Sequence, residues 1–226
     1  MEPLVAVITP ISYEHTDKLG DTLALIANEK AGIIKAGCVC ISAPQEKEAL
    51  GVIENRCSEN GVKLMLVGRD ITLTESGSSE DGELFSVKSF FDGYIDLETR
   101  LLGGHQLENA AAAIGAAEAL RYHDIVIRNE AIRAGVSSAA WPGRFEIVGK
   151  RPYVVLDGAQ NRASARALAA AVKRIFGPDK KRYERLILVY AITNDKDIAR
   201  VQEEVAQISD TVIITKAKDP GRAAAP

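Results

Sequence analysis

The segment that most constrains this chain runs from Ile11 to Gly37 and reads ISYEHTDKLGDTLALIANEKAGIIKAG. It follows a short apolar run, Leu4–Ile8, whose length is typical of a buried strand. A polar turn over residues 14–17 comes next, and Asp21 or Thr22 is placed to cap a helix. The segment therefore predicts a strand, a turn and a helix in that order.

The helix in this segment carries one charged residue on an otherwise apolar stripe. Four residues at i, i+3, i+4 and i+7 share one face: Leu23, Ile26, Ala27 and Lys30. An isolated ammonium is costly to bury, so a buried lysine needs a partner or a chemical modification. The alternative is that Lys30 reaches solvent at the helix end or pairs with a nearby acid.

The residues EHTDKLGDTLALIANEKAGIIKAG resemble the signature of the folylpolyglutamate synthase and dihydrofolate synthase family, within the Mur ligase superfamily. The match is long and specific, although Glu14 stands where many members have Asp. The resemblance implies that His15 binds Mg²⁺ and that Lys30, as a catalytic residue, carries a carbamate whose oxygens reach the metal. Mg²⁺ prefers oxygen ligands, and a carbamate replaces the repelling ammonium with a carboxylate-like group.

The composition is that of a soluble globular protein, with 46% hydrophobic and 26% charged residues. The net charge of −3 gives no indication of binding to nucleic acid or to an anionic membrane. No apolar run approaches membrane-spanning length and no signal peptide is recognisable, so we expect a cytoplasmic protein. Cys38 and Cys40 form a pair that could bind metal. The better interpretation is that these two cysteines and Cys57 are small buried residues of a protein in a reducing compartment.

The order of the following elements predicts an α/β fold. A strand at 39–42, a helical run over 45–59 and a strand at 63–67 alternate as in a parallel sheet. Residues 70–99 form short alternating pieces between Gly and Ser turns, which predicts a small antiparallel meander. With the resemblance, we expect part of a Mur-ligase-type central domain, followed by an incomplete Rossmann-like C-terminal domain.

An Ala-rich helix within residues 101–120 carries the next motif. Asn109 lies off its apolar stripe, which is formed by Leu107, Ala110, Ala111 and Ile114. From the pattern alone Asn109 either caps the helix or faces solvent. GHQLENAAAA resembles a family motif whose Asn contacts the nucleotide, which implies that Asn109 binds ATP.

A further helix over 129–139 leads to WPGRFEIV, in which the turn at Pro142-Gly143 presents Arg144. A lone arginine on a turn is usually only solvated. PGRFE, however, resembles the family's linker motif, whose Arg reaches the ATP phosphates, and a guanidinium suits phosphate oxygens. We expect Arg144 to bind ATP and assist catalysis. We divide the chain here, into part of the central ATP-binding domain (1–145) and a truncated glutamate-ligase domain (146–226).

The second domain opens with a strand at 153–156 and then DGAQN, a place where open α/β sheets bind ligands. Asn161 could be only a helix N-cap, whereas Asp157 ends an apolar strand and is harder to explain by structure alone. DGAQN resembles the family motif DGAHN, which implies that Asp157 contacts ATP. Gln160 replaces the usual histidine, and it cannot carry the charge of a protonated imidazole.

The last predicted elements are a strand at 185–190, a helix with Ile198 and Val201 on its apolar face, and a strand at 211–215. The segment NDKD resembles a family loop, which implies that Asp195 and Lys196 help the second domain to close over the site. The alternative is a surface charge cluster at a helix start.

The resemblance implies a ligase that adds L-glutamate to dihydropteroate or a (tetrahydro)folate. A substrate carboxylate attacks the γ-phosphate of ATP to form an acyl phosphate, from which the amine of glutamate displaces phosphate; Mg²⁺ neutralises the phosphate oxygens. The two domains must close so that the acyl phosphate meets glutamate rather than water.

The chain contains no phosphate loop of the form Gly-x-x-x-x-Gly-Lys-Ser/Thr, which family members carry upstream of the matched segment. We therefore expect a fragment that is inactive alone and needs an N-terminal segment or a second chain; the full-length enzyme is expected to be a monomer. Two alternatives stay open: another amide ligase of the Mur superfamily, and a truncated, non-catalytic remnant or binding module.

Overall fold

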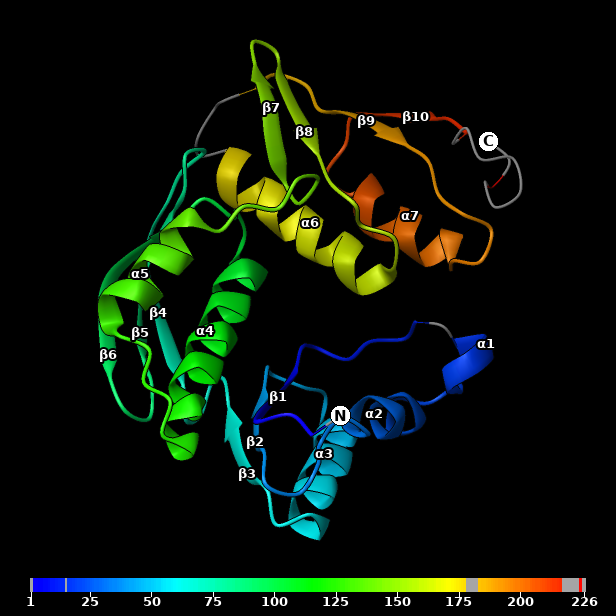
Figure 1. The fold of residues 1–226 in the computed structure, drawn as a ribbon. Coiled ribbons are helices and arrows are strands. Elements are labelled where there is room, and N and C mark those ends of the chain that lie inside the picture. Colours follow the sequence, from blue (N-terminus) through cyan, green and yellow to red (C-terminus); the bar gives the residue numbers. More distant parts are fainter. Residues whose placement is uncertain (1, 15, 178–182, 217–223, 225–226) are drawn as a thin grey trace. The chain divides into compact units, whose positions relative to one another are not determined.

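The computed structural model describes residues 2–14, 16–177, 183–216 and 224. The chain forms two compact units (Figure 1). The first comprises Met1–Gly77, Gly82–Arg100 and His105–Ala140, and the second comprises Ser78–Asp81, Leu101–Gly104 and Trp141–Pro226. Within the described ranges, no helix combines the length and the apolar character needed to cross a membrane.

The first unit is built on a parallel sheet and an antiparallel meander. Its elements are β1 (Val5–Ile8), α1 (Thr16–Leu19), α2 (Leu23–Ala31), β2 (Val39–Ser42), α3 (Lys47–Glu59), β3 (Lys63–Leu66), β4 (Thr72–Ser78), β5 (Glu83–Lys88), β6 (Gly93–Thr99), α4 (Gly104–Ala119), the 3₁₀ turn η1 (Leu120–His123) and α5 (Asn129–Ser138). Strands β1, β2 and β3 pair in parallel in that order, and β5 pairs with β6 in an antiparallel manner. Both sheets agree with the sequence prediction.

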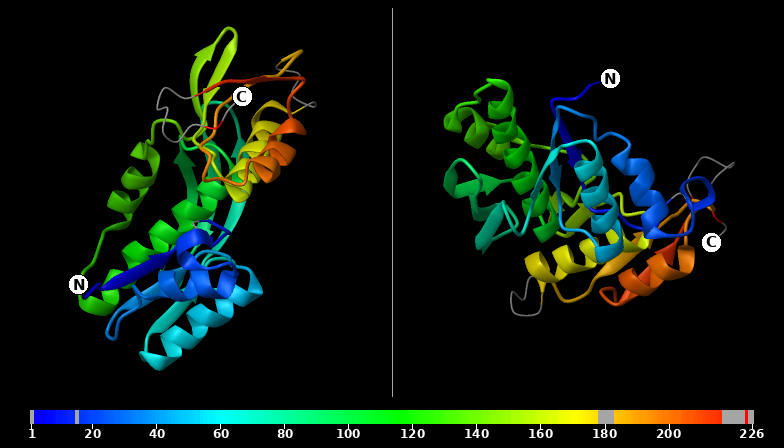
Figure 2. Two further views of the ribbon diagram at one scale, coloured as in Figure 1. Left: turned by 90° about the vertical axis from the view of Figure 1, so that its right-hand side faces the viewer. Right: turned by 90° about the horizontal axis from the view of Figure 1, so that it is seen from below.

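Other elements of the first unit cover the parallel sheet on both faces (Figure 2). One face packs on α2 and α3 through a core that includes Ile34, Cys40 and Ile53. The other face packs on α4 and the meander through a core that includes Ile41 and Phe85. All four residues of β2 are buried, which is why this strand has no alternation between polar and apolar residues.

The start of α2 agrees with the sequence prediction, but the preceding segment does not. Thr22 is the N-cap, and its Oγ1 accepts a hydrogen bond from the backbone N–H of Leu25 at 3.2 Å. The prediction of a polar turn over 14–17 is wrong in part, because residues 16–19 form the short helix α1. A single helical turn is too short to show an apolar period in the sequence.

The second unit contains β7 (Glu146–Lys150), β8 (Tyr153–Leu156), α6 (Arg162–Phe176), β9 (Ile187–Tyr190), α7 (Ile198–Ala206) and β10 (Thr211–Ile214). Strands β9 and β10 are parallel, and α7 connects them. Strands β7 and β8 form an antiparallel pair. The sequence prediction contains no strand at β7, because the motif PGRFE was compared only with the family's linker motif.

The strands of the second unit carry their core on one side only. In β9, Leu188 and Tyr190 pack with Val201 of α7, whereas Val189 is 65% exposed. In β8, Val155 packs towards α6 and Leu156 is 49% exposed. Parallel strands such as β9 and β10 are usually covered on both faces, whereas an antiparallel pair such as β7 and β8 commonly exposes one face. The exposed side of β9 therefore agrees with the expectation of an incomplete Rossmann-like domain.

Candidate functional site

Two of the predicted ATP-binding residues lie next to each other in the second unit. Arg144 is exposed in the turn before β7, and Asp157 directly follows β8. Asp157 Oδ2 accepts a hydrogen bond from the backbone N–H of Phe145 at 2.9 Å, and its Oδ1 accepts one from the N–H of Ala159 at 2.8 Å. A methyl group added at Gly158 would lie 3.9 Å from Nη1 of Arg144, so the guanidinium lies against the loop that Asp157 begins.

The turn that carries Arg144 is anchored on both sides of this residue. Gly143 has φ 70°, and its N–H donates to Oε2 of Glu146 at 2.8 Å. Phe145 has φ 46°, a left-handed conformation that is uncommon for a residue with a side chain. The Phe145 ring is only 2% exposed and stacks with Phe176 at a centroid distance of 6.2 Å. The backbone therefore turns Arg144 outward while Phe145 enters the core.

Asn161 caps α6, as one of the two sequence interpretations predicted. Its Oδ1 accepts a hydrogen bond from the N–H of Ser164 at 2.9 Å, and Ser164 Oγ accepts one from the N–H of Asn161 at 3.0 Å. These reciprocal bonds form a capping box. Gln160 is exposed beside the cap, and its backbone N–H also donates to Ser164 Oγ at 3.0 Å.

Asp195 and Lys196 lie in the loop before α7. Lys196 Nζ is 3.4 Å from Oδ2 of Asp195. A hydrogen bond from Thr193 and the interaction with Lys196 lower the pKa of the Asp195 carboxyl to about 2. The Lys196 side chain is only 8% exposed, so this lysine is more enclosed than a solvated surface charge. Asp197 caps α7 by accepting a hydrogen bond from the N–H of Arg200 at 3.2 Å.

Lys30 belongs to the first unit and is exposed. The buried face of α2 contains Leu23, Ile26, Ala27 and Ala31, and not Lys30. Lys30 lies in the last turn of α2, where a long side chain reaches solvent and a cation interacts favourably with the helix dipole. Its exposure agrees with the interpretation that Lys30 reaches solvent at the helix end, and the carbamate stays a prediction.

The predicted magnesium ligands are only partly within the described structure. His15 lies outside the described residues. Among the residues that are described, no group of three or more His, Cys, Asp and Glu side chains is placed to hold a metal ion. An ammonium offers no lone pair to a cation, so Lys30 fits a metal site only in its carbamate form.

Asn109 lies on α4 in the first unit and is exposed, as expected for a residue off the apolar stripe. Its Nδ2 donates to Oε1 of Gln106 at 3.1 Å. Leu107 and Ile114 are buried on the opposite side of the helix. The amide of Asn109 is thus oriented by a neighbour one helical turn away.

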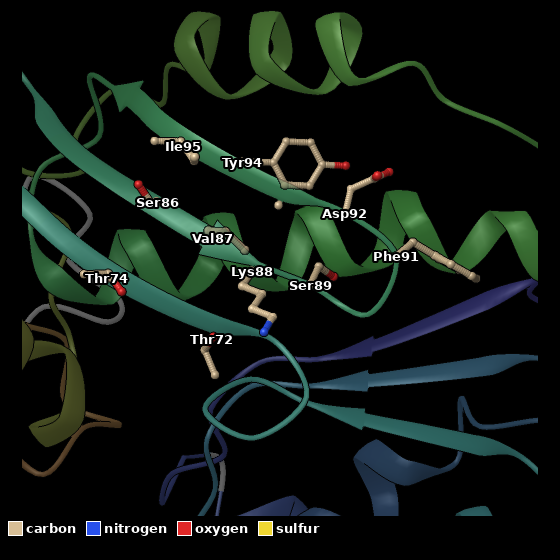
Figure 3. A pocket seen from close by; sticks show the side chains of 11 residues that line it. Thr72, Thr74, Ser86, Val87, Lys88, Ser89, Phe91, Asp92, Tyr94 and Ile95 are labelled. Carbon is tan, nitrogen blue, oxygen red and sulfur yellow. The ribbon is translucent and has the colours of Figure 1, made fainter.

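Sequence reasoning missed a hollow of about 440 Å³ on the meander sheet (Figure 3). Residues of β4, β5 and β6 line it, with hydroxyl side chains from Thr72, Thr74 and Ser86 and the amino group of Lys88. None of the predicted site residues lines this hollow. Alternating hydroxyl residues are typical of the solvated face of any antiparallel sheet, so the sequence carried no signal for a hollow there.

Two family models cover most of the chain. The model of the Mur ligase middle domain matches residues 1–117, and the model described as Mur ligase, glutamate ligase domain, matches residues 143–226. The chain belongs to the Mur ligase family. The two matches fall on the stretches in which the sequence motifs were found.

Individual relatives show which members of this family the chain resembles. The dihydrofolate synthase/folylpolyglutamate synthase of Bacillus subtilis is 36% identical over 213 residues, which are 94% of this chain and 48% of the relative. The Mycobacterium tuberculosis folylpolyglutamate synthase complexed with ADP superposes with a TM-score of 0.89 at 28% identity, over 99% of this chain and 49% of that one.

A third comparison, with an FPGS–AMPPCP–folate complex, gives a TM-score of 0.87 at 27% identity, over 95% of this chain and 51% of the other. These matches confirm the resemblance to folylpolyglutamate and dihydrofolate synthases and the α/β Mur-ligase-type fold. This Mur ligase family chain spans about half the length of the relative and the two structures named here.

Proposed function

We propose that this polypeptide is part of an ATP-dependent ligase that adds L-glutamate to dihydropteroate or to a (tetrahydro)folate. The names of the relatives support this reaction, and the similar structures contain ADP, or AMPPCP and folate. The observation in this chain that carries the proposal is the anchored turn that holds an exposed Arg144 against the loop after β8.

Each residue has a part in this proposal. Arg144 binds phosphate oxygens through its guanidinium, and its charge stabilises the negative charge that develops during phosphoryl transfer. Asn109 and Asp157 complete the ATP-binding set. Four residues near the starts of α6 and α7 lie close to the substrate and ATP in this proposal: Gln160, Asn161, Asp195 and Lys196. Of these, Asp195 and Lys196 help the second unit to close over the site.

The proposal includes Mg²⁺ held by His15 and by Lys30 as a carbamate. Lys30 is exposed and its amino group is not engaged with any acid that the structure describes, so the group is open to reaction with carbon dioxide. When bound, Mg²⁺ would neutralise the negative charge of the phosphate oxygens. An intact-mass increment of one CO₂ that disappears on acidification, and is absent in Lys30→Ala, is the expected signature of the carbamate.

The activity is tested by following ADP formation that depends on both glutamate and a pteroate or folate. The isolated 226 residues are expected to be inactive, since their sequence contains no phosphate loop. Supplying a polypeptide that carries the loop should restore ligation, and Arg144→Ala should then lower kcat at least about 100-fold. Turnover by the isolated chain would contradict the requirement for a supplied loop.

The same assay separates the two alternatives. Activity with a UDP-sugar peptide instead of dihydropteroate would identify another Mur-superfamily amide ligase. No activity with any substrate in the presence of the loop would identify a non-catalytic remnant. The relatives favour the folate branch. A cytoplasmic location and a monomeric full-length enzyme belong to the proposal as well; an immunoblot of fractionated source cells tests the location and the size of the native protein.

A further inference from the structure

Both carboxylate oxygens of Asp157 are engaged by backbone N–H groups. One oxygen accepts from Phe145 at 2.9 Å, across the start of β7, and the other accepts from Ala159 at 2.8 Å within the loop that follows β8. A carboxylate that accepts two backbone hydrogen bonds is held in one position, and its remaining lone pairs can still accept from a ligand. The side chain thus joins two segments that are twelve residues apart in the sequence.

The N–H that Asp157 holds belongs to the residue that follows Arg144. Phe145 is in the left-handed region, a conformation that persists only where the surroundings enforce it. Two interactions enforce it: the hydrogen bond to Asp157 and the burial of the Phe145 ring. The second carboxylate of the turn, Glu146, accepts the N–H of Gly143 at 2.8 Å. Arg144 lies between these two anchored amides.

We infer that Asp157 is a positioning residue for Arg144. It holds the turn at 143–146 against the loop at 157–159, and so directs the Arg144 guanidinium across Gly158 towards a phosphate-bearing ligand. This inference rests on the proposed function for the identity of the ligand, but the hydrogen bonds that carry it do not. It gives Asp157 an action through Arg144 in addition to the ATP contact of the proposed function.

The test compares ATP with inorganic tripolyphosphate, which has no ribose. Titration calorimetry on the chain would measure the affinity of both ligands for wild type, Asp157→Asn, Arg144→Ala and the double variant. We expect Asp157→Asn to weaken tripolyphosphate binding about tenfold and ATP binding at least as much, because one charged hydrogen-bond acceptor is lost and Arg144 is no longer held. In the Arg144→Ala background, Asp157→Asn should have no further effect on the affinity for tripolyphosphate.

Asp210→Asn is a matched control. Asp210 Oδ2 accepts the backbone N–H of Leu186 at 2.7 Å, so it also anchors backbone in the second unit, but it holds no part of the Arg144 turn. This variant should lower thermal stability and leave tripolyphosphate affinity unchanged. A purely structural role for Asp157 would make the two variants behave alike.

Two results would overturn the inference. The first is an Asp157→Asn variant that loses affinity for ATP but not for tripolyphosphate, which would indicate a direct ribose contact. The second is an effect of Asp157→Asn on tripolyphosphate affinity that persists in full without Arg144. If the chain binds neither ligand, the proposed function stands, because the chain contains no phosphate loop. Amide hydrogen exchange then decides the inference: Asp157→Asn must accelerate exchange at Phe145, and unchanged exchange contradicts it.

Discussion

The hydroxyl of Tyr94 on β6 donates a hydrogen bond to the Glu118 carboxylate on α4 at 3.0 Å, inside the core of the first unit. Glu118 is only 1% exposed and also accepts the backbone N–H groups of Phe91 and Asp92, each at 3.2 Å. Burial and the adjacent carboxylate raise the pKa of the Tyr94 hydroxyl above its usual value. One carboxylate thus joins the meander to the helix that covers it.

Replacing Glu118 should be among the most destabilising single changes in the first unit. Glu118→Ala leaves the backbone N–H groups of Phe91 and Asp92 without this acceptor, and leaves the Tyr94 hydroxyl only the 3.5 Å contact with Oδ1 of Asn129. It should lower the free energy of unfolding by about 3 kcal/mol or more. Tyr94→Phe removes only one of the three bonds and should cost about 1–2 kcal/mol. Urea denaturation of the two variants tests this order, and an equal loss in both would contradict it.

The ion pairs between α6 and α7 should make stability depend on pH. Glu204 Oε1 lies 2.9 Å from both Arg166 and Arg162, and these arginines lower the pKa of the Glu204 carboxyl below its ordinary 4.5. The unfolded chain therefore binds this proton at a higher pH than the folded chain does. The stabilisation by these ion pairs is fully present above the pKa that the Glu204 carboxyl has in the unfolded chain. It is lost as the pH falls through the pKa that this carboxyl has in the folded chain.

Glu204→Gln should accordingly lower the urea midpoint at pH 7, and the difference from wild type should shrink below about pH 4. Glu203→Gln is the matched control, because Glu203 is exposed on the same helix. This control should change the midpoint little at either pH. A Glu204→Gln difference that is as large at pH 3.5 as at pH 7 would show that packing, and not charge, is responsible.

Gly115 should tolerate a methyl group poorly, in contrast to another helical glycine. On α4, a Cβ at Gly115 would lie 2.3 Å from Cδ1 of the fully buried Ile71, whereas a Cβ at Gly135 on α5 would meet nothing within 4 Å. Gly135→Ala should raise the free energy of unfolding by about 0.5–1 kcal/mol, the helix propensity gain. Gly115→Ala should instead lower it by about 1 kcal/mol, because overpacking exceeds that gain. Thermal unfolding of both variants provides the measurement.

The cysteines should be inert in the folded protein. Cys38, Cys40 and Cys57 are free and buried. The hydrogen bond with Cys57 and burial raise the pKa of the Cys40 thiol, whereas the same hydrogen bond lowers the pKa of the Cys57 thiol. The burial of all three side chains, and not a shared pKa shift, keeps the reagent away from them. We expect a disulfide reagent such as Ellman's to label none of the three in native buffer and all of them in denaturant. Rapid labelling of the native chain would contradict the buried position of the thiols.

Much of the fold was predictable because it depends on local periodicity. The continuous apolar run of β2 and the apolar stripe of α4 are written in the order of the residues, and so is the Thr22 cap of α2. The strand β7 was missed because its side chains are partly exposed and follow a turn, so no alternation marks it. The exposure of Lys30 stayed open between two interpretations for a related reason: helical spacing gives the direction of a side chain but not where the core ends.

The sequence by itself determined which residues are candidates for chemistry, since motif matches depend on residue type and spacing alone: Asn109, Arg144 and Asp157 are all in this category. Only the tertiary structure decided what those side chains do locally. Asp157 could have faced a ligand or the backbone, and the choice rests on the N–H of Phe145 lying 2.9 Å away. Such a bond joins residues that are distant in the chain, and their proximity arises only when the two segments pack together.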